Sequence, residues 1–149
     1  MKALLNLDRE RLCILGIWIF FFFVNYCLVS WTDWNRFSMA EGTVEGFRDP
    51  INKLYVALCA MYAPPLLTML GVVFASKKTS GRRQPSSGIF MIAITASALW
   101  NLSLVAQIAR MGVFQVIEIQ NLLELLPIQS GALSLITGML GFYFSTDKS

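Results

Sequence analysis

Residues 12–31 read LCILGIWIFFFFVNYCLVSW and contain no charged side chain. Because each residue of an α-helix rises about 1.5 Å, about 20 apolar residues cross a hydrocarbon core of about 30 Å. The run is too long for the apolar core of a signal peptide, and no small-residue cleavage site follows it closely. The stretch therefore predicts a transmembrane helix.

Three further runs without charged residues follow at 54–76, 88–109 and 128–145. The chain of 149 residues is 56% hydrophobic and 14% charged, whereas soluble domains carry about a quarter charged residues. Four spans use more than half of this length, and a chain of this size is expected to form one domain. We therefore expect an all-α integral membrane four-helix bundle, with residues 1–149 as a single membrane domain.

Charged residues between the runs predict the orientation. Basic residues precede the first span, and the loop 77–87 carries four basic residues and no acidic one. In the segments 32–53 and 111–126, acidic residues outnumber basic ones. Since short cytoplasmic loops are enriched in Lys and Arg, we expect both termini and the loop 77–87 to be cytoplasmic. We expect the plasma (inner) membrane as the location, with 32–53 and 111–126 outside.

The segment 111–126 is too apolar for an ordinary loop. Placed on a helix, it sets Glu118 and Glu124 on one face and gathers apolar residues on the other, namely Val116, Ile119, Leu122, Leu123 and Leu126. Two interpretations are open: a short amphipathic helix on the outer leaflet, or an extension of the third span. Gly112 as a helix breaker and Pro127 in the first turn of the fourth span favour the separate helix.

Two consecutive prolines, Pro64 and Pro65, stand near the middle of the second span. Neither has a backbone N–H, so the carbonyls of Ala60 and Met61 lose their helical partners and the axis kinks. The kink is either a hinge or a static bend that improves packing, because membrane helices tolerate proline.

Amides and hydroxyls inside the spans are candidate functional groups. Asn25 and Asn101 lie at the same predicted depth from the cytoplasmic face, and Ser97 and Gln107 are further polar residues of the third span. The amides either form hydrogen bonds between helices or line a pore within an oligomer.

The fourth span carries small residues at helical spacing. Ser130, Ser134 and Gly138 form one stripe, and Gly141 belongs to a second. Small residues let helix backbones approach closely, so these positions predict packing within one bundle or between copies. A homo-oligomer is expected.

The loop 77–87 contains Lys77, Lys78, Arg82 and Arg83. Three interpretations are open. The charges set topology alone, attract anionic lipid headgroups, or dock an acidic cytosolic protein.

The residue inventory argues against several functions. The chain has no histidine, its spans contain no Asp, Glu, Lys or Arg, and no glycine-rich phosphate loop occurs. We therefore expect no catalytic residue, metal or cofactor, and the protein is not expected to be an enzyme. Coupled transport has little support because such spans usually hold a charged group. The basic residues flank spans, so nucleic acid is not an expected partner.

Two functional hypotheses remain. The first is a non-enzymatic oligomeric membrane subunit that senses, anchors or scaffolds across the bilayer and contacts a cytosolic partner. The alternative is a homo-oligomeric ion channel or membrane-depolarising pore. By shape alone, the chain is similar to small four-span immunity proteins, to membrane components of bacterial stress and anti-phage systems, and to channel accessory subunits.

Overall fold

The computed structural model describes residues 2–39, 44–75 and 87–145. These residues form four long α-helices: α1 (Lys2–Met39), α2 (Val44–Ala75), α3 (Ser87–Gly112) and α4 (Ile119–Ser145). Each contains a stretch long and apolar enough to cross a membrane. The all-helical fold and the four candidate spans expected from the sequence are thereby confirmed.

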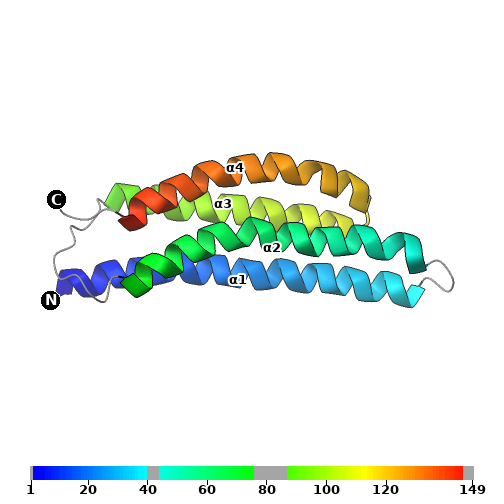
Figure 1. The fold of residues 1–149 in the computed structure, drawn as a ribbon, viewed down its shortest axis with the longest axis horizontal. Helices are drawn as coiled ribbons and strands as arrows, with labels where there is room; N and C mark the ends of the chain where they lie inside the picture. The colour runs from blue at the N-terminus through cyan, green and yellow to red at the C-terminus, as the bar shows by residue number, and fades with distance from the viewer. Residues whose placement is uncertain (1, 40–43, 76–86, 146–149) are drawn as a thin grey trace.

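The four helices form a bundle in which each helix packs against two neighbours (Figure 1). Helix α1 contacts α2 and α3, and α4 also contacts α2 and α3. Helices α1 and α3 begin at the end where α2 and α4 finish, which we call the terminal end. The other end, where α3 is joined to α4, is called the opposite end. The start of α1 and the end of α4 therefore lie at the same end of the bundle, as an even number of membrane crossings would place them.

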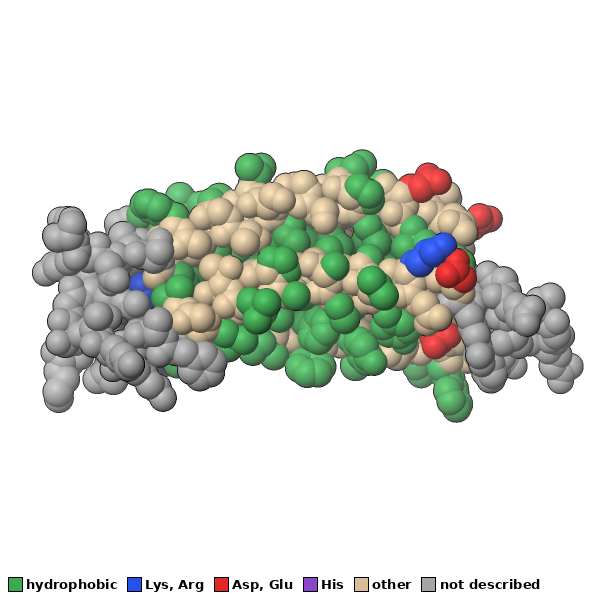
Figure 2. Space-filling model, in the orientation of Figure 1, with side chains coloured by type: hydrophobic (Ala, Val, Ile, Leu, Met, Phe, Trp, Pro, Cys, Tyr) green, Lys and Arg blue, Asp and Glu red, His purple; other side chains and the backbone are tan. Residues whose placement is uncertain are grey.

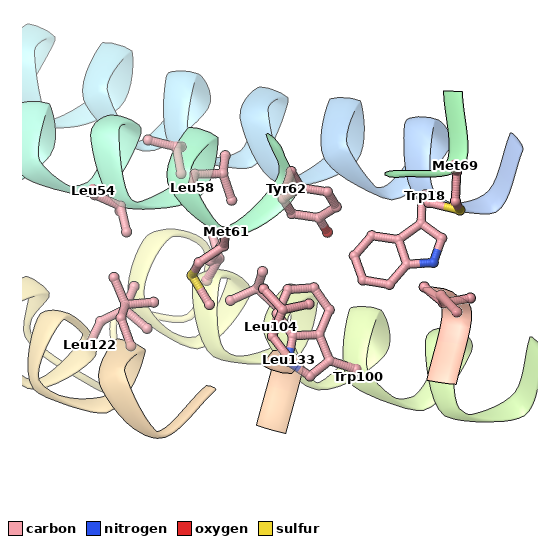
Figure 3. Packing of buried hydrophobic residues seen from close by; sticks show 14 of the residues in the cluster. Trp18, Leu54, Leu58, Met61, Tyr62, Met69, Trp100, Leu104, Leu122 and Leu133 are labelled. Carbon is pink, nitrogen blue, oxygen red and sulfur yellow. The ribbon is translucent and has the colours of Figure 1, made fainter. Parts of the chain in front are cut away.

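Apolar side chains fill the interior and also cover the outside. The interior is one cluster to which all four helices contribute, including Trp18, Tyr62, Leu104 and Leu133 (Figure 3). On the outside, large apolar side chains are exposed along the whole bundle. In the face shown in Figure 2, charged side chains of the described residues lie only near the two ends. A soluble monomer rarely exposes so large an apolar surface, whereas lipid favours one.

The separate amphipathic helix expected over 111–126 is absent from the described residues. Helix α3 ends at Gly112, and α4 starts at Ile119 and continues through Pro127. The connection is a tight turn in which the Val116 N–H donates to the Arg110 carbonyl at 2.9 Å. That expectation was wrong because Pro127 lies inside α4 and not at the start of a helix.

One buried seam explains why α4 continues through the proline. Ile119, Leu122, Leu126, Leu133 and Leu140 are all at most 7% exposed and follow one another at spacings of three, four and seven residues. A common interior face on both sides of Pro127 outweighs the loss of one backbone hydrogen bond.

The segment 32–53 also differs from the expected outer loop. Helix α1 continues to Met39 and α2 starts at Val44, so most of that segment is helical. Charged residues mark the edge of an apolar span, but the helix can continue past that edge because Arg, Lys and Glu have good helix propensity. The basic residues Lys77, Lys78, Arg82 and Arg83 lie outside the described residues.

Candidate functional site

The centre of the bundle holds a chain of hydrogen bonds across three helices. The Asn25 Nδ2 of α1 donates to the Tyr62 hydroxyl of α2 at 2.8 Å, and this hydroxyl donates to the Asn101 Oδ1 of α3 at 2.5 Å. The three side chains are at most 1% exposed. The two asparagines therefore lie close together, as their common depth suggested, but a tyrosine bridges them.

The hydrogen bonding in this layer is incomplete. Asn101 Nδ2 donates to the Ser97 carbonyl one turn earlier at 2.8 Å. Within the described part of the chain, Asn25 Oδ1, Ser97 Oγ and Trp18 Nε1 are buried without a hydrogen-bond partner. The layer therefore retains unused hydrogen-bonding capacity. Each unpaired buried polar group costs about 1–3 kcal/mol of stability.

Three aromatic rings close the space beside these amides. Trp18 of α1 stacks on Trp100 of α3 with a centroid separation of 5.4 Å and an interplanar angle of 22°. The Tyr62 ring meets both indoles edge to face at 5.7 Å. Figure 3 shows the three side chains inside the bundle. Rings in these geometries favour one another beyond their buried area, so the centre is a packed polar and aromatic core.

The fourth helix joins this core through Trp100. Its indole Nε1 donates to the Gln129 carbonyl of α4 at 3.1 Å, and Gln129 Nε2 donates to Ser103 Oγ at 3.2 Å. Gln107 Nε2 donates to the same hydroxyl at 3.5 Å. Gln107 is partly buried, and its Oε1 is buried without a hydrogen-bond partner among the described residues.

A second polar cluster ties α1 to α4 at the terminal end. Arg11 is 1% exposed, and its Nη2 donates to the Phe144 carbonyl at 3.1 Å while the guanidinium lies 5.8 Å from the Phe144 ring centroid. The Tyr143 hydroxyl donates to Glu10 Oε2 at 3.1 Å. A cation beside the carbonyl end of a helix interacts favourably with the helix dipole.

The candidate hinge lies directly after Tyr62. Helix α2 runs through Pro64 and Pro65 without a break and bends along its length (Figure 1). Pro65 is buried and Pro64 is exposed. The Thr68 hydroxyl donates to the Pro64 carbonyl at 2.8 Å. That this bend acts as a hinge stays a prediction.

The small residues of α4 make no close helix contact at the two glycines, and Gly138 lines a pocket with Ile89 and Ala93 of α3. Ser130, Ser134 and Gly138 are exposed. A Cβ added at Gly138 or Gly141 would meet no atom within 4 Å. Of the two expected uses, packing inside one bundle therefore finds no support at these glycines.

Reasoning from sequence missed Tyr62, Arg11 and Gln129. Tyrosine prefers membrane interfaces, so a tyrosine in the middle of an apolar span is a usable signal for an interior hydrogen bond. Arg11 gave a weaker signal because a basic residue just before a span is normally assigned to orientation alone.

The core offers neutral hydrogen-bonding groups enclosed by rings. Among the described residues, no three His, Cys, Asp or Glu side chains are grouped so that they could hold a metal ion. The chain matches no protein-family model, no curated protein and no solved structure. The geometry of the core and of its two ends is therefore the basis for assigning a function.

Proposed function

We propose that this protein is a non-enzymatic, oligomeric membrane subunit that crosses the bilayer four times and serves as a sensor or scaffold. The observation that carries the proposal is the hydrogen-bonded core Asn25–Tyr62–Asn101, extended to α4 through Trp100. Since one connected layer holds all four helices, a displacement of one helix is resisted by the others. Such a body can hold partners at fixed positions on the two faces of a membrane.

The charge distribution supports an orientation with the terminal end in the cytoplasm. The N-terminal segment and the loop 77–87 are basic, whereas Glu118 and Glu124 lie at the opposite end, where α4 begins. Lys and Arg are retained on the cytoplasmic side of membrane proteins. In this orientation the loop 77–87 faces the cytosol, where an acidic protein surface fits its four positive charges.

Insertion and copy number are tested on the full-length protein expressed in cells. Washing membranes at alkaline pH should leave the chain in the pellet, while detergent should release it as a particle heavier than one chain. Recovery in the wash supernatant, or a strictly monomeric particle, would contradict the membrane subunit or its oligomeric state, respectively.

Partner binding is tested by changing the loop charges. Replacement of Lys77, Lys78, Arg82 and Arg83 by glutamine should reduce co-purification of a cytosolic protein. The matched control exchanges each lysine for arginine and each arginine for lysine, which keeps the charge. Unchanged co-purification in the neutral variant, with topology verified, would contradict docking through this loop.

The pore hypothesis has less support. Asn25, Ser97 and Asn101 are 0% exposed and lie within one chain, so they do not line a space between copies. Rings occupy the centre of the bundle itself. We expect the purified protein to be silent in planar bilayers, and reproducible single-channel currents would favour the pore.

A further inference from the structure

A pocket lies between α1 and α3 at the terminal end. It is lined by Arg9, Glu10, Cys13 and Phe90 and has a volume of about 260 Å³. Arg9 and Cys13 are exposed, while Glu10 and Phe90 are partly buried. The pocket therefore combines one cation, one carboxylate and an apolar wall.

The polarity of the pocket changes along the bundle axis. Arg9 and Glu10 precede the apolar run of α1 and are separated from it by Arg11, while Cys13 lies inside the run and Phe90 lies in the first turn of α3. If the helices cross the bilayer as proposed above, the charged rim lies at headgroup depth and the apolar wall reaches the acyl chains. The same gradient is found along a phospholipid molecule.

Tyr143 supports two walls of the pocket from behind. This side chain is 0% exposed, and its hydroxyl donates to Glu10 Oε2 at 3.1 Å. Its ring lies 6.2 Å from the ring of Phe90. One buried residue of α4 thus holds the carboxylate of α1 and the ring of α3. Because a carboxylate accepts several hydrogen bonds, Glu10 keeps capacity for a second donor.

The two charges at the rim are not paired with each other. Within the described ranges, the only ion pair joins Lys53 and Asp49 at the other end of the molecule. Arg9 and Glu10 are adjacent in sequence, and on a helix neighbouring residues do not face each other. An external ligand with both a negative and a positive group can therefore satisfy both.

We propose that this pocket binds one phospholipid whose headgroup carries a primary amine, such as phosphatidylethanolamine. The Arg9 guanidinium binds the phosphate, the Glu10 carboxylate accepts from the ammonium group, and an acyl chain lies against Cys13 and Phe90. A choline headgroup has no N–H to donate, and a glycerol headgroup has no cation. The proposal rests on the membrane placement given under the proposed function.

Native mass spectrometry of the full-length protein in detergent tests the pocket. Phosphatidylethanolamine, phosphatidylcholine and phosphatidylglycerol with identical acyl chains are added separately. The unmodified protein should retain the ethanolamine lipid best, and excess inorganic phosphate should not displace it because phosphate lacks the acyl chain. Equal retention of the three lipids, or displacement by phosphate, would overturn the proposal.

Substitutions at Arg9 and at Glu10 test the two charges separately. Arg9→Gln should lower retention of all three lipids by about fivefold, the effect of losing one basic group at a membrane surface. Glu10→Gln keeps an acceptor for Tyr143 and should lose only the preference for the amine. Arg9→Lys, which keeps the positive charge, should retain binding. If Arg9→Gln binds the ethanolamine lipid as the unmodified protein does, the pocket is not its site.

Matched controls lie at the opposite end of the bundle. Arg110→Gln and Glu124→Gln remove exposed charges there and should leave lipid retention unchanged. A loss in these variants as large as in Arg9→Gln contradicts a specific pocket.

Alkaline washing of membranes that contain Arg9→Gln separates the two proposals. An Arg9→Gln variant that stays in the membrane but retains less lipid supports the pocket, whereas an unmodified protein that is washed out removes the membrane placement as well.

Discussion

At the scale of single residues, the packing of the bundle depends on the hydroxyl of Tyr62. It accepts a hydrogen bond from Asn25 and donates one to Asn101, so a single oxygen atom joins three helices. Neither amide has access to solvent. Removing the bridge therefore leaves buried groups without partners instead of returning them to water.

Tyr62→Phe tests this bridge. The substitution keeps the ring that packs against Trp18 and Trp100 and deletes only the oxygen. We expect the free energy of unfolding, measured by denaturant titration in micelles, to fall by about 1–3 kcal/mol. Tyr26→Phe, at a side chain 43% exposed, is the control and should have little effect. Equal stability of Tyr62→Phe and the unmodified protein would contradict the structural role of the bridge.

Gly112 of α3 lies close to Thr32 of α1. A Cβ at this position would overlap the Oγ1 of Thr32 and come within 3.2 Å of its Cβ. Gly112→Ala should therefore destabilise the fold by about 1–3 kcal/mol in the same titration, as overpacking does.

The double variant Gly112→Ala with Thr32→Ala identifies the cause of that loss. It should recover most of the stability because the overlapping hydroxyl is gone. Gly131→Ala meets no atom within 4 Å and serves as the control. Absence of recovery in the double variant would show that the overlap with Thr32 is not the reason.

Residue positions could be predicted along the helix axis but not around it. Counting from the span boundaries placed Asn25 and Asn101 at one depth, and they do share one hydrogen-bonded layer. Which helix face turns inward depends on tertiary packing. When nearly every residue is apolar, the sequence carries no amphipathic pattern to indicate that face. The outward direction of Ser130 and Ser134 was therefore not predictable.

At the scale of the elements, apolar runs predicted the four helices but not their ends. Charge shows where a span leaves the apolar region, while helix ends depend on capping and on packing beyond that region. Helix α1 continues to Met39, and α4 begins before Pro127, for this reason. A proline was a poor boundary signal here because a continuous buried face runs past it.

Arg11 fixes the C-terminal end of α4 to α1. Its guanidinium donates to the Phe144 carbonyl from a buried position. A hydrogen bond from a charged group contributes about 1.5–3 kcal/mol. Arg11→Gln should therefore raise amide hydrogen exchange in the last turn of α4 by about tenfold or more, measured by mass spectrometry.

Lys53→Gln is the comparison for this prediction. It breaks the exposed pair with Asp49, which is worth at most about 1 kcal/mol, and should leave exchange in α4 unchanged. Exchange in the last turn of α4 that is the same in Arg11→Gln and in the unmodified protein would contradict the clamp.

At the scale of the whole molecule, the outer surface differs from that of a soluble bundle. A few hydrogen-bonding groups lie within an apolar core, large apolar side chains cover the outside, and charges are confined to the ends of the displayed face (Figure 2). In lipid this arrangement joins the core amides by internal hydrogen bonds and places mainly apolar groups against the hydrocarbon. We propose that the difference in charge between the two ends selects one of the two orientations.

Labelling of single cysteines tests this membrane placement most directly. Cys13, Cys27 and Cys59 are first replaced by alanine, and one cysteine is then introduced at Val116 or at Ser80. An impermeant maleimide applied to intact cells should label the cysteine at position 116 and leave the one at position 80 unlabelled until the membrane is opened. Labelling of position 80 from outside, or of both positions equally in intact cells, would contradict four crossings with the terminal end in the cytoplasm.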